Sequence, residues 1–352
     1  MSPTSTGGWG IMEEEARRMS RWTFAMMAMG ASGAAWAQEV VVHVDPELAA
    51  QTGVDSAEVE RQIKAASGGQ FKLDAPRTFL EQTAAANAFA TKGMGVDYAS
   101  NPQRFVVGGS FGSAVQGAGL TFVRGKESLP EAGFALQAAV MAGLNLGFLS
   151  PDESLLRRFV VSVNGMYVGG KTGPFEADLY NLGGHLQIKL IRPPHEGVVE
   201  WGGLDVTTGY ELSSYALHLS QALSVDAEGL RWDADGNFDV VSKSETIPIE
   251  LSTNVRVLVL SAYVGIAGDL RRSAYATGDI SLAGPLWFTG GGQEQEIGTV
   301  DATLGTRGEA LGFVPRGFVG AQINILPVKL YGHLNLGLDD TYGGHVGLRV
   351  AL

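Results

Sequence analysis

From Arg104 to the end of the chain, apolar and polar positions alternate with a period of two residues. Every second residue from Leu136 to Phe148 is apolar, and the residues between them are small or polar; the stretch from Tyr180 to Leu190 repeats this pattern. Such a period predicts β-strands with one continuous apolar face. Many of the runs reach ten or more residues, and their second face is rich in glycine and amides, which is typical of strands in a membrane barrel.

Short turns alternate with longer connections along this region, as they do in an antiparallel barrel. Short turns are expected near 150–154, 192–197, 257–259 and 325–327, and outer hairpin insertions at about 221–244 and 273–308. In the first insertion, Asp235-Gly236 predicts a tight hairpin turn. The pattern predicts about ten strands, within a range of 8–14, near 104–115, 134–149, 155–168, 175–191, 198–217, 245–256, 260–272, 309–324, 327–338 and 342–352.

Residues 38–100 have a helical character instead. Polar helix-forming residues occupy 45–64, and a second helix is expected after Pro76. Phe79, Ala86 and Phe89 lie on one stripe of that helix. The stripe predicts either a plug inside the barrel or a helix under its periplasmic rim.

The N-terminus has the three parts of a signal peptide. Arg17, Arg18 and Arg21 precede an uncharged stretch that ends in Ala35-Trp36-Ala37. We expect export with cleavage after Ala37, so that residues 1–37 are removed. Three glutamates before the basic residues are atypical of a leader, which indicates an internal start codon.

Composition narrows the class of protein. Glycine accounts for 49 of 352 residues, cysteine is absent, and the formal net charge is −12. The lack of cysteine excludes disulfides and thiolate metal sites. A chain this acidic lacks the basic surface of a nucleic-acid-binding protein, so no nucleic-acid partner is expected.

An exported, cysteine-free, glycine-rich chain whose period-two strands run to an apolar last residue resembles the outer-membrane β-barrel proteins of Gram-negative bacteria. The resemblance covers about 104–352, within a barrel domain expected over 101–352, and departs at Leu352, where such proteins favour an aromatic residue. It implies an outer-membrane location, a C-terminal strand that ends in the periplasm, and the surrounding lipid and the barrel-assembly machinery as partners.

The polar face of the predicted strands supplies the candidate lumen residues. They are His185, Lys189, Glu211, Arg256, Asp269, Arg271, Lys329, His333 and Arg349. A ten-stranded barrel has room for little besides side chains, so charges of both signs are expected to pair across a nearly filled interior. No motif fixes a catalytic geometry or a phosphate loop, and the spacing of Asp233, Asp235, Asn237 and Asp239 fails that of an EF-hand. Neither an enzyme nor a cofactor or metal is expected.

Two functions remain open. The first is a porin-like barrel, or one that binds a solute or a hydrophobic ligand. The second is a non-enzymatic barrel that acts through its outer loops on envelope partners in a surface adhesion, motility or export assembly. A soluble secreted β-sandwich is the alternative fold.

Overall fold

The computed structural model describes residues 39–45, 47, 57–58, 61, 74–117, 132–149, 155–193, 197–227, 229–289, 294–325 and 327–352. The predicted signal peptide and most of the first predicted helix lie outside these residues. Within the described ranges, no helix is long and apolar enough to cross a membrane.

The described elements are almost all strands of one sheet. The helix is α4 (Asp74–Ala90) and two short 3₁₀ helices are η1 (Leu146–Leu149) and η2 (Leu155–Arg158). The strands are β1 (Glu39–Val44), β2 (Phe105–Gln116), β3 (Gly133–Asn145), β4 (Phe159–Thr172), β5 (Phe175–Ile191), β6 (Val199–Ala227), β7 (Leu230–Val257), β8 (Leu260–Phe288), β9 (Gln295–Glu309), β10 (Gly312–Ile325), β11 (Val328–Gly337) and β12 (Thr341–Ala351).

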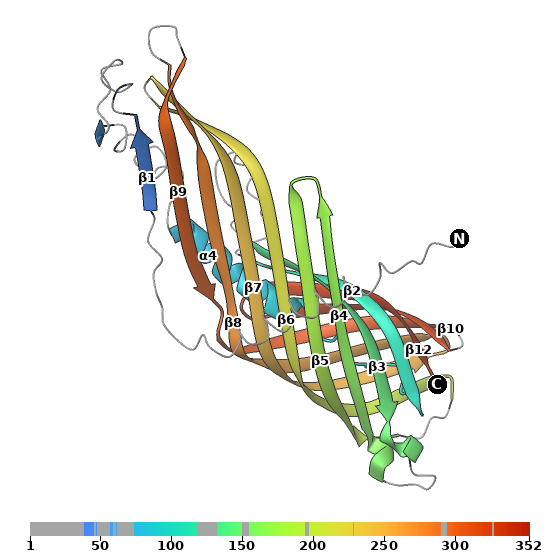
Figure 1. Ribbon diagram of the computed structural model, residues 1–352. Coiled ribbons are helices and arrows are strands. Elements are labelled where there is room, and N and C mark those ends of the chain that lie inside the picture. The colour runs from blue at the N-terminus through green and yellow to red at the C-terminus, as the bar shows by residue number, and fades with distance from the viewer. Residues whose placement is uncertain are drawn as a thin grey trace, which may run out of the picture. The chain divides into compact units, whose positions relative to one another are not determined.

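Ten of these described strands close into a ring (Figure 1). Hydrogen-bonded neighbours follow the order β8–β10–β11–β12–β2–β3–β4–β5–β6–β7, and β7 pairs with β8 again. Residues 260–271 of β8 pair with β10, whereas residues 275–288 pair with β9, which in turn pairs with β1. All pairs are antiparallel, so the fold is a closed antiparallel barrel. The barrel predicted from the period of two is confirmed.

The two faces of the ring differ in chemical character. On β7, Thr246, Glu250 and Ser252 are buried, whereas Ile249 and Leu251 between them are exposed. Because successive side chains of a strand point to opposite sides, polar rows face the lumen and aliphatic rows face outward.

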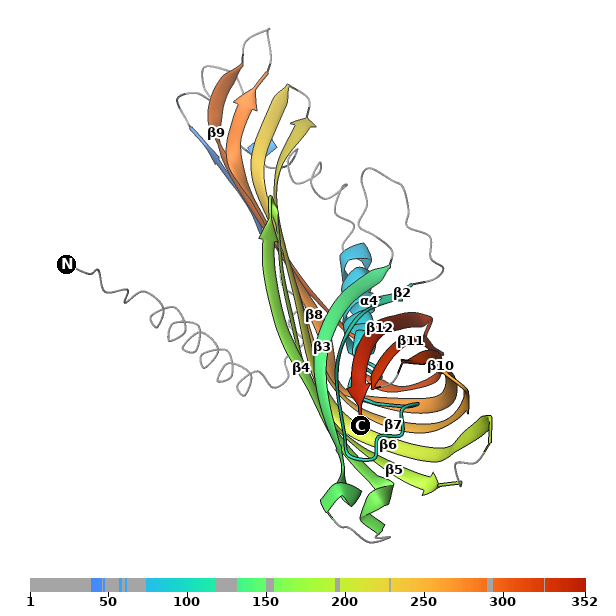
Figure 2. The ribbon, with the colours of Figure 1, turned by 90° about the vertical axis from the view of Figure 1, so that its right-hand side faces the viewer.

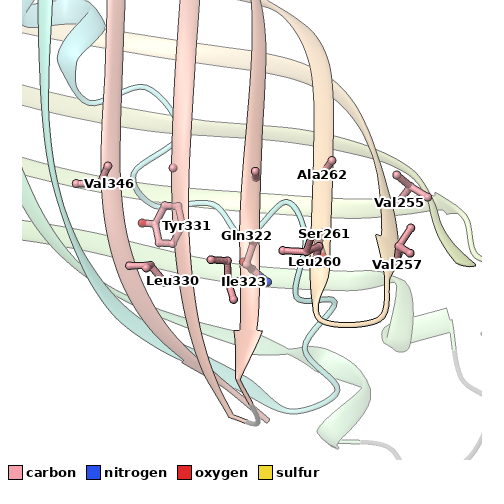
Figure 3. A pocket seen from close by; sticks show the side chains of 12 residues that line it. Val255, Val257, Leu260, Ser261, Ala262, Gln322, Ile323, Leu330, Tyr331 and Val346 are labelled. Carbon is pink, nitrogen blue, oxygen red and sulfur yellow. The ribbon is translucent and has the colours of Figure 1, made fainter. Parts of the chain in front are cut away.

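A hollow of about 580 Å³ shows the outward surface in detail (Figure 3). It spans β7, β8, β10, β11 and β12. Its lining residues are Val255, Val257, Leu260, Ser261, Ala262, Ala321, Gln322, Ile323, Leu330, Tyr331, Gly332 and Val346. None of them carries a formal charge, so this part of the outer wall is almost wholly apolar.

Past the ring, several strands continue as a sheet that we call the extension (Figure 1). It consists of residues 218–227 of β6, 230–245 of β7 and 273–288 of β8, together with β9 and β1. Here the two faces exchange character. Trp232 and Leu286 are buried on the side that continues the lumen face, whereas His218, Asp239 and Asp279 form a polar row across the opposite side.

The helix α4 lies inside the ring. From Thr83 to Ala90 every residue is buried, and Phe89 and Ala86 pack against Ala114 of β2 and Ala135 of β3. Figure 2 shows α4 enclosed by the curving strands β3, β2 and β12. Phe79, the third residue of the predicted stripe, is only partly buried and packs near Leu80.

The position of α4 decides between the two arrangements that the sequence left open. Phe89 approaches Gly337 and Gly343, which flank the turn between β11 and β12. This turn and the extension lie at one end of the ring, which we call the helix end, and Leu352 lies at the other, the Leu352 end. The helix therefore does not lie under the rim where the chain ends; it lies inside the opposite end.

Two local expectations were wrong. The Asp235-Gly236 dipeptide does not form a turn, because β7 is continuous from Leu230 and pairs with β6 on one side and β8 on the other. The turn falls instead next to Gly229, whose φ is 80°. Residues 39–44, predicted to be part of a helical region, form β1 because β9 offers them a free sheet edge.

Candidate functional site

A stretch of chain between α4 and β2 runs through the lumen from one end to the other. We call residues 91–103 the lumen segment. Residues 91–99 are all buried, and the backbone nitrogen of Arg104 donates to the carbonyl oxygen of Leu352 at 2.8 Å. The segment therefore enters at the helix end and leaves at the Leu352 end, where β2 begins.

A buried ion pair holds the first residues of the segment. Lys92 Nζ lies 2.6 Å from Glu211 Oε2 on β6 and also donates to the hydroxyl of Thr246 on β7. Thr91 donates to the same carboxylate at 3.1 Å, and Asn335 on β11 donates to the Lys92 carbonyl at 3.0 Å. The side chains of Lys92 and Glu211 are only 1% and 4% exposed, so this pair is formed away from water.

An aromatic cluster surrounds the middle of the segment. The ring of Tyr98 stacks on Tyr263 and His333 at centroid distances of 5.2 and 5.4 Å and lies 4.9 Å from Phe318. His333 stacks in turn on His345 at 4.5 Å. These rings come from the four neighbouring strands β8, β10, β11 and β12, so packing as well as charge holds the segment to this part of the ring.

The hydroxyl of Tyr98 connects this cluster to a second charged network. It donates to Glu250 Oε2 at 2.7 Å. Glu250 also pairs with Arg316, and Arg316 Nε lies 2.8 Å from Asp269 Oδ2. Arg316 further donates to Asn335 at 2.6 Å. Each charge in this network therefore has an opposite charge or a polar partner, which a buried charge requires.

A third attachment lies between Asp97 and Arg349. Arg349 Nη1 is 2.9 Å from Asp97 Oδ1, and its guanidinium lies 3.6 Å from the ring centroid of Tyr331. The same nitrogen donates to the carbonyl of Val96 at 3.3 Å. Both side chains of the ion pair are 1% exposed, so the pair is inaccessible to water.

Glycine permits the segment to pass this close to the wall. A Cβ on Gly95 would lie 2.2 Å from Asn164 Oδ1 and 2.5 Å from His185 Nε2. Gly93 has a φ of 85°, a conformation that other residues rarely adopt. Ser162 uses the space beside Gly95 and donates to its carbonyl at 2.8 Å.

The last part of the segment is bound near the Leu352 end. Lys189 Nζ donates to Asn101 Oδ1 at 2.5 Å, and Asn145 donates to the carbonyl of Pro102 at 3.0 Å. Polar contacts of the wall thus follow the segment along its whole length. The lumen therefore contains a length of polypeptide that the wall binds through ion pairs and hydrogen bonds at several points.

The predicted lumen residues divide into two groups. Seven of them are buried in the ring: His185, Lys189, Glu211, Asp269, Arg271, His333 and Arg349. Arg256 instead lies at the Leu352 end with its side chain 46% exposed, 3.9 Å from Glu200, and Lys329 is only partly buried. The deep residues do not face one another across an otherwise empty interior, since several of them bind the lumen segment.

The sequence did not point to several of the residues that form these contacts. Lys92, Asp97 and Tyr98 belong to a stretch that it assigned to the end of a helical region, and Arg316 lies on the polar face of β10. The signal for Arg316 was present in the period of two. Within the described part of the chain, no group of three or more histidine and acidic side chains could hold a metal ion.

The fold and the lumen define a class: a closed antiparallel β-barrel filled by its own N-terminal region. The chain matches the Lsa36-like family over residues 45–352 and belongs to that family. No curated protein matches its sequence.

Three solved structures resemble the chain at low identity. The CymD monoaromatic hydrocarbon channel is 8% identical, with 78% of this chain and 98% of that chain covered and a TM-score of 0.26. Omp33 of Acinetobacter baumannii is 12% identical, with 71% and 99% covered and a TM-score of 0.25. The translocator domain of the autotransporter NalP from Neisseria meningitidis is 8% identical, with 82% and 97% covered and a TM-score of 0.28. The assignment of the fold rests on the strand pairing of this chain.

Proposed function

We propose that the protein is an outer-membrane β-barrel that is closed by its own lumen segment and presents the extension at the cell surface. The observation that carries the proposal is the distribution of polarity around the ring. Ionised and amide side chains are buried inside, whereas large aliphatic side chains such as Val264, Ile266 and Leu334 are 53–64% exposed outside. Water disfavours such a surface, and the hydrocarbon core of a membrane favours it.

The exchange of faces at the extension supports a membrane boundary at that level. Exposed large aliphatic residues on β7 and β8 end at Ile249 and Leu270. Beyond them the same face carries polar and charged side chains such as Lys243, Asp239 and Asp279, and its aliphatic residues Ile247 and Val241 are partly buried. Exposed tyrosines lie near the same level on neighbouring strands, at Tyr167, Tyr180 and Tyr210. Aromatic residues of this kind gather at membrane surfaces.

The orientation follows from the class of protein. In outer-membrane barrels the last strand ends in the periplasm, so the Leu352 end of this barrel faces the periplasm and the extension faces outward. The lumen segment then carries the chain from the extracellular end of the barrel to the periplasmic end, α4 lies inside the extracellular end, and β1 lies in the extension outside the membrane. The strand β1 is thus displayed at the surface together with the rest of the extension.

The contacts of the lumen segment favour a closed barrel over an open pore. Lys92, Asp97 and Tyr98 bind charged groups on β6, β12 and β7, and each contact is buried. A solute would have to displace these contacts before it could pass. We therefore favour the second of the two functions considered above, in which the barrel acts through its outer part on a partner, without catalysis.

Bilayer conductance of the purified protein tests the proposal. We expect no steady conductance from the wild type, and openings from Lys92→Ala/Asp97→Ala, which removes both ion pairs of the segment. Lys171→Ala is the matched control, because Lys171 pairs with Glu176 on the exposed hairpin of β4 and β5 and should not change conductance.

Two outcomes would contradict the proposal in different ways. A steady pore in the wild-type protein would mean that the segment does not close the barrel. Extraction from membranes by salt alone, without a heat-dependent change of gel mobility, would mean that the ring is not a membrane barrel.

A further inference from the structure

Three polar side chains on the outward face of the extension are joined by hydrogen bonds. His218 of β6 and Asp239 of β7 are register partners, and His218 Nδ1 lies 2.5 Å from Asp239 Oδ1. His218 Nε2 lies 3.0 Å from the hydroxyl oxygen of Ser220, two residues further along β6. Both side chains of β6 point to the same side because the side chains of a strand alternate. The imidazole of His218 therefore lies between a serine and a carboxylate.

The order of these groups decides where the hydrogens of the imidazole lie. A carboxylate only accepts, so Asp239 binds the hydrogen that a neutral imidazole carries on Nδ1. The lone pair of Nε2 then accepts the hydroxyl hydrogen of Ser220. In this arrangement an imidazole can remove the proton of a serine and make its oxygen a nucleophile. No sequence motif marks it, because Asp239 lies 21 positions beyond His218 on another strand.

An amide lies beside the nucleophile. Asn237 is the register partner of Ser220, and its side chain lies 3.0 Å from the serine hydroxyl. Because Ser220 gives its hydrogen to His218, Asn237 meets the hydroxyl with its amide nitrogen, an orientation that an amide reaches by turning over. A side-chain amide that donates near the attacked carbon stabilises the negative oxygen of a tetrahedral intermediate. Asn237 supplies such a donor.

The site is open to water. The side chains of His218 and Asp239 are 33% and 49% exposed, and those of Ser220 and Asn237 are exposed as well. The pairing between β5 and β6 ends one residue before Ser220, so the serine lies beside the tip of the hairpin of β4 and β5. It also lies beyond Tyr210 on the same strand, outside the proposed membrane boundary. A substrate in the external water can therefore reach the hydroxyl directly.

The charges beside the site restrict the substrate. Glu176 of β5 is the register partner of His218, and Asp279 of β8 is the register partner of Asp239. Lys171 lies 3.4 Å from Glu176 and compensates this carboxylate in part. The remaining negative charge repels anions, and it favours substrates that are neutral or positively charged.

We propose that Ser220, His218 and Asp239 form a hydrolytic site for carboxylic esters of neutral or cationic molecules. Ser220 and His218 are the catalytic residues, whereas Asp239 is a positioning residue that acts through His218. The activity goes beyond the proposed function, which needs no catalysis and stands on the ring and the lumen segment. Only the location of the substrate outside the cell rests on the proposed orientation of the barrel.

The reaction has two steps that together consume one water molecule. Ser220 Oγ attacks the carbonyl carbon while its proton moves to His218 Nε2, and the tetrahedral intermediate expels the alcohol, which takes that proton. The acyl group stays on Ser220 as an ester. Water then loses a proton to His218 and attacks this ester, and the serine oxygen takes the proton back as the carboxylic acid leaves.

A neutral fluorophosphonate probe tests the site on the purified protein in detergent micelles, because an activated serine displaces its fluoride and keeps the phosphonyl group. We expect the wild type to be labelled at Ser220, and the rate to fall by about 100-fold or more in His218→Ala. Ser220→Ala should not be labelled. Ser224→Ala is the matched control and should be labelled at the wild-type rate, because Ser224 is exposed on the same face of β6 but donates to Asp233 at 2.7 Å.

Turnover of p-nitrophenyl acetate tests the positioning residue. In Asp239→Asn the amide can donate to Nδ1, which leaves the hydrogen of the imidazole on Nε2 and prevents Nε2 from accepting the proton of Ser220. We expect kcat to fall by about 100-fold with KM unchanged. A loss that appears only in KM would contradict this role. A choline ester should also have a higher kcat/KM than an anionic ester of similar size, and the reverse order would contradict the selection by charge.

Three outcomes of the labelling would overturn the site: an unlabelled wild type, a label on residues other than Ser220, or equal rates in the wild type and His218→Ala. Heat-dependent gel mobility confirms that each variant has folded. Extraction of the same preparation separates this failure from that of the proposed function. A membrane barrel without label loses only the hydrolytic site, whereas a labelled protein that salt extracts keeps the site and loses the membrane barrel.

Discussion

Arg349 and Asp97 show what a single buried contact contributes to this barrel. Their ion pair is 1% exposed on both sides, and the Tyr331 ring covers the guanidinium. Because burying both charges costs desolvation energy, such a pair adds little to the net free energy of folding. The loss of one partner, however, leaves the other charge buried without compensation. The lumen segment is thus held by contacts that are individually costly to break.

We expect Arg349→Met to lower the free energy of unfolding by about 3–5 kcal/mol, the usual cost of orphaning a buried charge. Denaturant unfolding in detergent micelles measures this value. Arg256→Met is the control, because Arg256 is 46% exposed at the Leu352 end and its pairing with Glu200 should be worth less than about 1 kcal/mol.

Removing both partners gives the opposite expectation. In Arg349→Met/Asp97→Leu no charge is left unpaired, so the double variant should recover part of the lost stability. If the two changes simply add, the pair does not act as a unit.

The residue scale was only half predictable. The period of two assigns His185, Glu211 and Arg349 to one face of their strands, because the pleat alternates side chains strictly. The period contains no information about what those residues touch. Lys92 and Asp97, the partners of Glu211 and Arg349, lie in a stretch without any period, so no local pattern could connect them to the wall.

At the scale of elements, the extension differs from the ring in the environment of its outward face. Asp279 of β8 is the register partner of Asp239 of β7, and His218 Nδ1 lies 2.5 Å from Asp239 Oδ1. Partial burial, and then repulsion from Asp239, raise the pKa of Asp279 above its ordinary value. The ionised form of Asp279 is therefore disfavoured in the folded extension.

We expect Asp279→Asn to stabilise the extension at neutral pH. An acid whose pKa is raised on folding favours the folded state below its ordinary pKa, and this contribution is lost as the pH rises through the folded pKa. Asparagine does not ionise, so the variant keeps this contribution as the pH rises. Its melting temperature should therefore exceed that of the wild type at neutral pH. In acid, below the ordinary pKa of aspartate, the two should converge.

Thermal melts at a series of pH values provide the measurement. Asp301→Asn, at an exposed position of β9, is the control and should show no comparable gain. A gain for Asp279→Asn that is the same at acid and neutral pH would contradict the electrostatic explanation.

The elements also show where local signals fail. Asp235-Gly236 is a strong hairpin signal, yet β7 runs straight through it because β6 and β8 satisfy its backbone on both sides. The seventeen-residue helix α4 was recognisable from the stripe of Phe79, Ala86 and Phe89, since that stripe packs in any apolar surroundings. The stripe did not indicate which apolar surface the helix would pack against.

At the scale of the whole molecule, the proposed orientation puts β1 outside the cell and the turn between β7 and β8 in the periplasm. A peptide tag inserted before Glu39 should bind antibody on intact cells, since β1 belongs to the extension. A tag inserted in the turn at Leu258–Val259 should bind only after the outer membrane is permeabilised, because that turn lies at the Leu352 end. The reverse pattern of labelling would show that the barrel is inserted the other way.

The strands and their two faces followed from the amino-acid sequence, because burial in a pleated strand leaves a period of two that is visible residue by residue. The order of strands also followed, since short turns join antiparallel neighbours. The content of the lumen did not. Lys92 and Glu211 stand 119 positions apart, and α4 packs against β2 and β3, which follow it in the chain. Only the closed ring brings such residues together, so the tertiary structure decided that the barrel is filled by its own chain.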